Sequence, residues 1–196
     1  VSRWFADEMT TRLGLDSARR RVLYPGLATA DYPLSTRPLD PPVLGYLSRL
    51  NDKLGLGRAL EVFLELKRTH PDLRFRALGG ELGKDRQGLH RWRRKLRRLG
   101  FENDVEFLED MDRESRLAFL ESLTLLSVPV PGGEACGLFI LEANASGVPV
   151  VQPDAGAFAE ILDLTGGGIV TPDDSVAALS HAMRDLLRDP RRLNEL

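Results

Sequence analysis

The 196-residue sequence predicts an α/β fold of the Rossmann type, in which a mainly parallel sheet carries helices on both faces. Two observations predict this fold. From about residue 40 to the end, short apolar segments alternate with segments of helical periodicity, and the connections between them are short. Strands that alternate with helices in this way run parallel, and right-handed crossovers place the helices on both faces of the sheet.

The first three elements after residue 40 follow from the spacing of apolar residues. The run PVLGYL at 42–47 predicts a buried strand. In 56–68, apolar residues recur every three or four positions, which predicts a helix that ends before Pro71. At 73–77, apolar residues alternate with two arginines, which predicts a half-buried strand.

The later elements repeat these two patterns. Apolar residues at helical spacing predict helices, and short apolar or β-branched runs predict strands. In chain order, we expect a helix over 89–99, a strand over 105–108, a helix over 113–121, a strand over 123–130, a helix over 137–146, strands over 148–151 and 169–170, and a helix over 175–189.

Residues 1–38 differ from the rest of the chain. A predicted helix over 1–15 and a strand tip over 21–23 are followed by a connector rich in proline. We therefore expect the end of one domain and a connector in this segment, and a Rossmann-like domain over 39–196. Because the chain begins at Val1 rather than Met, we interpret it as a piece of a longer protein.

The composition excludes several classes of protein. Twenty-seven basic and 29 acidic residues give a net charge of −2, so general nucleic-acid binding is not expected. The single Cys136 cannot form an internal disulfide and suggests a reducing compartment. No apolar stretch approaches the roughly 18 residues of a membrane span. We expect a cytoplasmic protein, with peripheral attachment to a membrane as an open alternative.

The segment most suited to chemistry follows the predicted strand 123–130. There, glycines turn the chain and a helix begins near Gly137, where free backbone N–H groups and the helix dipole favour an anion. Glu134 precedes this helix start and Glu142 lies within the helix, and each carboxylate can accept hydrogen bonds from neighbouring hydroxyl groups of a sugar. Alternatively, Glu134 only complements the dipole, and Glu142 is exposed or satisfied internally.

The run EACGLFILEANASGVPVV resembles the E-x7-E segment of the retaining group 1 (family 4) glycosyltransferases. Further blocks match in order: VLYPGLATADYP at 22–33, GYLSRLNDKLG at 45–55, the Gly79–Gly80 turn, VEFL at 105–108 and DAGAFAE at 154–160. Five positions depart from the family pattern, among them Ala157, which replaces a Gly, and Pro25, which replaces an Asn. Cys136 replaces a usual Phe, Glu109 replaces a Gly, and Leu54 stands where the family has Lys, with Lys53 one residue earlier.

The resemblance implies one half of a GT-B architecture, in which two Rossmann domains face each other across a cleft. This chain would be the C-terminal, donor-binding domain with the last stretch of the N-terminal domain, and it would be inactive alone. Its partners would be a nucleotide-diphosphate sugar, an unidentified acceptor and the missing N-terminal domain. The resemblance implies transfer with retention of configuration, without a cofactor or a bound metal.

The resemblance also implies roles for single residues. Glu134 would contact hydroxyl groups of the donor sugar and is the expected catalytic residue, and Glu142 would hold the ribose hydroxyl groups. Arg49, and Lys53 if its loop is bent, would pair with the diphosphate. The remaining donor contacts would be backbone N–H groups of Gly137, Leu138 and Phe139, and the strand residues Val105 and Phe107 beside the base.

Other interpretations stay open. The departures from the family pattern leave room for a nucleotide-binding or regulatory module without catalysis, and the architecture also suits a sugar-nucleotide epimerase. Asp110 and Asp112 form a D-x-D pair, which holds a metal in a different glycosyltransferase fold, although short matches of this kind arise by chance. The basic segment 90–98 suits either an anionic partner or a helix with a solvated basic side, and we favour the latter.

Overall fold

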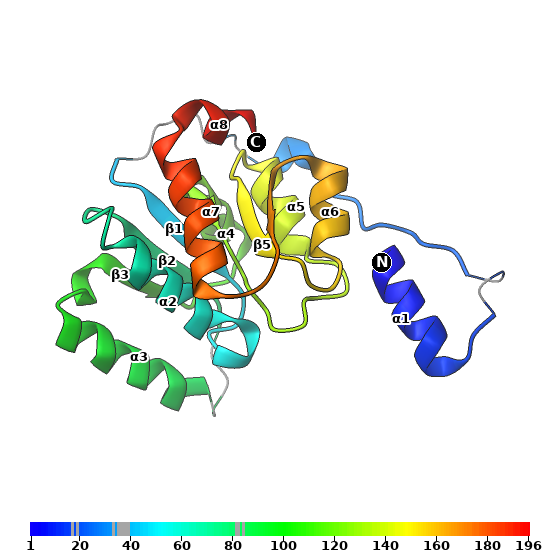
Figure 1. The fold of residues 1–196 in the computed structure, drawn as a ribbon, viewed down its shortest axis with the longest axis horizontal. Helices are drawn as coiled ribbons and strands as arrows, with labels where there is room; N and C mark the ends of the chain where they lie inside the picture. The colour runs from blue at the N-terminus through cyan, green and yellow to red at the C-terminus, as the bar shows by residue number, and fades with distance from the viewer. Residues whose placement is uncertain (17, 19, 33, 35–39, 81–82, 84) are drawn as a thin grey trace.

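A six-stranded parallel sheet forms the centre of the computed structural model (Figure 1). The structure describes residues 1–16, 18, 20–32, 34, 40–80, 83 and 85–196. The strand order is β3-β2-β1-β4-β5-β6, which is the doubly wound order of a Rossmann fold. The strands are β1 (Val43–Leu47), β2 (Arg74–Leu78), β3 (Val105–Leu108), β4 (Leu125–Leu126), β5 (Val150–Pro153) and β6 (Gly168–Thr171).

Helices cover both faces of the sheet, as predicted. Right-handed crossovers lead outward in two directions from the central strands β1 and β4. Helices α2, α3 and α7 therefore lie on one face of the sheet, and helices α4, α5 and α6 lie on the other face. The α-helices are α1 (Arg3–Leu13), α2 (Leu56–Leu66), α3 (Asp85–Leu99), α4 (Arg113–Glu121), α5 (Leu138–Ala145), α6 (Phe158–Thr165), α7 (Val176–Arg188) and α8 (Pro190–Glu195).

The core lies between the sheet and these two helix layers. All five residues of β1 are buried, as a strand covered on both faces requires. The apolar face of α2 packs against α7 and against the sheet, and Phe63 of α2 meets Phe75 of β2 with ring centroids 5.6 Å apart. This packing confirms the predicted α/β class.

One predicted strand is absent from the structure, and two observed helices were not predicted. Residues 21–23 form no strand, because no other described segment pairs with them and Leu23 is exposed. Helices α6 and α8 were not predicted, although Phe158, Ile161 and Leu162 have helical spacing and are buried in α6. The boundary expected near residue 38 lies outside the described residues.

β4 is much shorter than the predicted strand 123–130, and Gln152 explains why. The fully buried side chain of Gln152 accepts a hydrogen bond from the Val128 N–H and donates one to the Val128 carbonyl, both at 2.8 Å. Beyond Leu126, the Gln152 side chain therefore makes the hydrogen bonds that the backbone of a neighbouring strand would otherwise make. This substitution lets the chain leave the sheet early without burying unpaired polar groups.

Helix α1 lies beside α6 at the edge of the domain (Figure 1). None of its residues is buried, whereas its N-cap, Ser2, is fully buried. The helix therefore contacts the sheet domain through its N-terminus, while Arg20 of the following segment pairs with Asp7 and donates to the Thr10 hydroxyl along its side.

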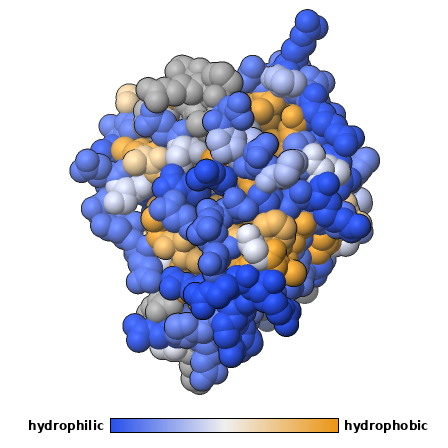
Figure 2. Space-filling view, turned by 90° about the vertical axis from the view of Figure 1, so that its left-hand side faces the viewer, coloured by the Kyte–Doolittle hydropathy of each residue, from blue (hydrophilic) through white to orange (hydrophobic). Residues whose placement is uncertain are grey.

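No helix among the described residues is both long and apolar enough to cross a membrane. Seen from the side of α3 and β3, the surface is mostly hydrophilic, and apolar side chains show between the charged ones (Figure 2).

Candidate functional site

The loops that follow β1, β2, β4 and β5 meet at the carboxyl edge of the sheet. The N–H of Leu50, after β1, donates to the carbonyl of Gly80, after β2, at 3.1 Å. Gly55 lies so close to the carbonyl of Pro129 that a Cβ would overlap it. Ligands of doubly wound sheets bind at this edge, so these contacts assemble the candidate site.

The loop that carries Glu134 is fixed by its backbone. Glu134 forms a parallel bridge with Gly156, and its carbonyl accepts a hydrogen bond from Ala157 N–H at 2.9 Å. The neighbouring Gly133 has a φ of 74°, and a Cβ there would overlap the backbone of Ala155. The Glu134 side chain is half-buried, and this burial raises the pKa of its carboxyl group.

The N-terminus of α5 directly follows the Glu134 loop and has no side-chain cap. Its N-cap, Gly137, has a φ of 66° and no side chain that could cap the helix. Leu138 is exposed, whereas Phe139 is buried against Phe158 with ring centroids 5.8 Å apart. The first N–H groups of α5 therefore begin beside the Glu134 loop and can bind an anion.

The carboxylate of Glu142 already has two partners within the chain. Oε2 accepts a hydrogen bond from an Arg116 NH2 group of α4 at 2.8 Å, and Oε1 accepts one from the Tyr32 hydroxyl at 3.3 Å. Burial of Glu142 in α5 is thus balanced by a cation. An ionised carboxylate has about four acceptor positions, so this arrangement leaves capacity for a ligand.

Arg49 and Lys53 line a common pocket of about 500 Å3 between the loop after β1 and the start of α3. Arg49 Nε pairs with the buried carboxylate of Asp85 at 3.2 Å, and Asn51 also bonds to Asp85. Leu54 instead packs against the core, which fits its apolar side chain. The structure therefore brings two predicted cations together, and Leu54 takes no place in the pocket lining.

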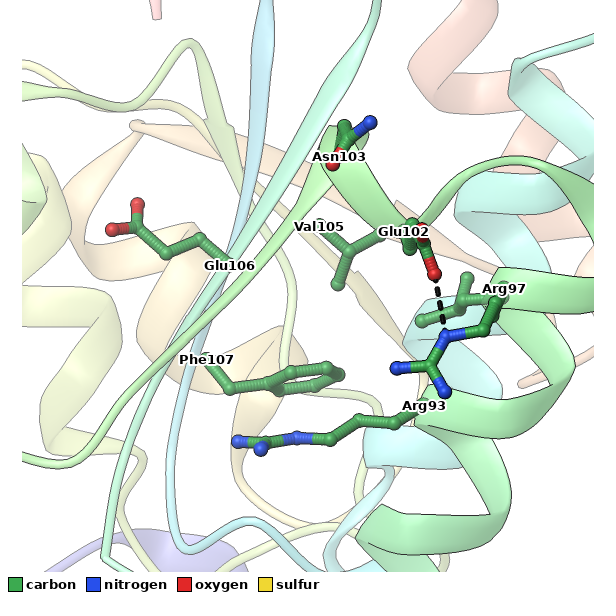
Figure 3. Close-up of a pocket in the computed structure, with 8 residues that line it drawn as sticks. Arg93, Arg97, Glu102, Asn103, Val105, Glu106 and Phe107 are labelled. Atoms are coloured by element: carbon green, nitrogen blue, oxygen red, sulfur yellow. Dashed lines mark hydrogen bonds and ion pairs between the residues drawn. The ribbon is translucent and has the colours of Figure 1, made fainter.

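Val105 and Phe107 lie in a different pocket, of about 420 Å3, between β3 and the second half of α3 (Figure 3). The Arg93 guanidinium lies 5.5 Å from the centroid of the Phe107 ring. Glu106 points to the other face of the strand, where it pairs with Arg76 at 2.6 Å. The structure thus does not join the two predicted base contacts to the pocket of Arg49.

The carboxylates of the D-x-D pair have local roles. Asp112 is the N-cap of α4 and accepts a hydrogen bond from Ser115 N–H at 2.7 Å, while Asp110 accepts one from Asp112 N–H at 3.1 Å. These hydrogen bonds satisfy the start of a helix.

The basic segment forms a helix with its cationic side in solvent. Leu89 and Leu96 of α3 are buried, whereas its six arginines are exposed. Leu99, expected on the same buried face, is instead 44% exposed because it ends the helix at the edge of the domain.

Sequence reasoning missed four residues that shape the site. Arg116, Tyr32 and Gln152 gave no local signal, because their partners lie 24 to 110 positions away along the chain. Glu160 was noticed only as part of a family block, and the structure gives it four hydrogen bonds from residues 3, 4 and 24.

The doubly wound sheet and the loops at its carboxyl edge define a Rossmann-like α/β domain. A family model described as "Glycosyl transferases group 1" matches residues 33–196. The chain therefore belongs to the group 1 glycosyltransferases, as the E-x7-E block predicts.

The relatives that this chain matches include a glycogen synthase and several glycosyltransferases. A glycogen synthase of Mycobacterium tuberculosis is 31% identical over 186 residues, which cover 94% of this chain and 44% of the relative. The GDP-mannose-dependent α-(1-6)-phosphatidylinositol monomannoside mannosyltransferase of Mycolicibacterium smegmatis is 33% identical over 160 residues, which cover 78% of this chain and 40% of the relative. The chain thus spans less than half the length of these relatives.

Solved structures confirm the fold. The C-terminal domain of a group 1 glycosyltransferase (LpcC) from Francisella tularensis superposes with a TM-score of 0.76 at 18% identity, covering 87% of this chain and 92% of that one. The Anabaena protein Alr3699/HepE, crystallised with UDP and glucose, gives a TM-score of 0.81 at 22% identity, covering 97% of this chain and 53% of that one. The fold is that of one GT-B domain.

Proposed function

We propose that this chain is the donor-binding domain of a glycosyltransferase that takes a sugar from a nucleotide-diphosphate sugar and transfers it with retention of configuration. One observation carries the proposal. The uncapped N-terminus of α5 begins between the half-buried Glu134 and the buried Glu142, so an anion site lies between two acceptors for hydroxyl groups. The structure of HepE with UDP and glucose supports this assignment by likeness of fold.

In this proposal each group has one role. The N–H groups of Gly137, Leu138 and Phe139 bind the diphosphate with Arg49 and Lys53, and no metal ion is needed. Glu134 accepts hydrogen bonds from the donor sugar, which compensates for the burial that raises the pKa of its carboxyl group.

Glu142 binds the ribose in the proposed complex. The Tyr32 hydroxyl, 3.3 Å from Oε1, occupies an acceptor position that a ribose hydroxyl can take over. Arg116 donates to the other oxygen at 2.8 Å and supplies the opposite charge.

Nucleotide binding tests the proposal directly. We expect UDP or GDP, and the matching UDP-glucose or GDP-mannose, to bind the chain in calorimetric titrations, with affinity unchanged by EDTA. Arg49→Ala removes one charge-assisted contact and should weaken binding by about tenfold or more, and Lys53→Ala should weaken it less. Arg58→Ala, which removes a cation paired with Asp174 outside the Arg49 pocket, is the control. Absence of binding by the wild type, or equal affinity in Arg49→Ala and Arg58→Ala, would refute the assignment.

Catalysis should require more than this chain. Transfer needs donor and acceptor held together, and we propose that a second domain supplies the acceptor wall. We expect residues 1–196 to bind a donor without multiple-turnover transfer, measured as release of nucleoside diphosphate with a panel of sugar acceptors. Sustained turnover by the chain alone would contradict this expectation.

A further inference from the structure

Glu160 lies on the first turn of α6 and joins that helix to α1. Its Oε1 accepts a hydrogen bond from Arg3 N–H at 2.8 Å, and its Oε2 accepts one from Trp4 N–H at 3.0 Å. The Tyr24 hydroxyl and Arg3 Nε also donate to Oε1. All four donors belong to residues 1–24, which precede the nucleotide domain expected from residue 39.

This set of donors is suited to an ionised carboxylate. Burial of Glu160 opposes ionisation, but hydrogen bonds from the Tyr24 hydroxyl, the Trp4 and Arg3 amides and the Arg3 side chain overcome it and lower the pKa to about 2. The side chain is only 11% exposed. Both oxygens accept hydrogen bonds from α1, and Oε1 also accepts one from Tyr24, so complementing the α6 dipole does not by itself explain the position.

Ser2 makes a second connection from the same end of α1. Its hydroxyl is fully buried, donates to the Ala135 carbonyl at 2.6 Å and accepts from Phe5 N–H at 3.1 Å. Ala135 directly follows Glu134, whose carbonyl is bonded to Ala157 N–H ahead of α6. The N-terminus of α1, the Glu134 loop and the first turn of α6 therefore form a closed triangle of hydrogen bonds.

We propose that Glu160 is a positioning residue, which holds α1 against the Glu134 loop and thereby fixes the Glu134 carboxylate for the donor sugar. This inference rests on the proposed function, in which Glu134 binds the donor sugar. Glu160 itself makes no contact with the donor. Binding of the donor sugar would then depend on residues 1–24, which precede the nucleotide domain. Among the described residues, loss of Glu160 still leaves the hydrogen bond from Ser2 to the Ala135 carbonyl between α1 and the loop.

Amide hydrogen exchange followed by NMR tests the contact without any ligand. Glu160→Ala should speed exchange at Arg3 and Trp4 by about tenfold or more, because each charge-assisted bond is worth at least that factor, and exchange at 133–137 should rise with it. Glu160→Gln keeps one acceptor and should give a smaller rise. Asp163→Asn changes an exposed carboxylate on the same helix and is the matched control. If Glu160→Ala does not fold, Tyr24→Phe, which removes one donor, should still speed exchange in both segments.

Ligand titration separates this inference from the proposed function. The affinity of Glu160→Ala for UDP should match that of the wild type. The factor by which UDP-glucose binds more tightly than UDP should fall by about tenfold. GDP and GDP-mannose are run in parallel. If no nucleotide binds the wild type, the proposed function fails and the exchange data alone decide the contact. Exchange at 133–137 equal in Glu160→Ala and Asp163→Asn, or equal loss of UDP and UDP-glucose affinity, overturns the positioning role.

Discussion

Gly133→Ala is expected to destabilise the chain by about 3 kcal/mol or more. The φ of 74° costs an alanine about 1–2 kcal/mol, and its Cβ would overlap the backbone of Ala155 and Gly156. The loop must then move away, which breaks the hydrogen bond from Ala157 to Glu134, worth about 1 kcal/mol. For a chain of this size, thermal unfolding should begin about 6–12 °C lower.

Gly132→Ala is a matched control for this change. Gly132 has a φ of 78°, nearly that of its neighbour, yet nothing lies within 4 Å of a Cβ built there. We therefore expect only the strain of about 1–2 kcal/mol at this position. Of the two variants, only Gly133→Ala should also lose the tighter binding of UDP-glucose relative to UDP. Equal melting temperatures for the two variants would mean that the Glu134 loop does not rest on Ala155.

Glu142→Ala is expected to lower both stability and nucleotide affinity. Exposed ion pairs contribute about 0–1 kcal/mol, whereas removal of one partner of a buried pair costs about 3–5 kcal/mol. Arg116 is one-third exposed, and its Nε has no hydrogen-bond partner among the described residues. We therefore expect Glu142→Ala to lower the free energy of unfolding by about 2 kcal/mol, between these two ranges, and the melting temperature by about 4–8 °C.

The pair of Arg113 with Asp31 provides the control on the same helix. These side chains are 3.0 Å apart but 66% and 55% exposed, so Arg113→Met should cost less than about 1 kcal/mol. Arg116→Met with Glu142→Gln completes a double-mutant cycle by urea unfolding. Additive losses in that cycle would show that Arg116 does not stabilise Glu142. Unchanged affinity of Glu142→Ala for the plain nucleotide diphosphate would remove Glu142 from the proposed site.

Much of the fold and of the site could be predicted from the sequence because the relevant signals are local. Apolar periodicity placed α4 and β3 at their observed bounds, and the glycines after β4 marked the loop that precedes α5. The E-x7-E block located Glu134 and Glu142 on either side of a helix start, where the structure has them.

The sequence by itself determined the class of the domain, its strand and helix alternation and the family to which it belongs. Only the tertiary structure showed that Arg116 and Tyr32 bind Glu142, that Gln152 ends β4, and that Glu160 holds α1. Hydrophobic periodicity reports how one segment alternates between core and solvent. It carries no information on which distant side chain meets a buried polar group, because that pairing depends on how the packed helices and loops are arranged in space.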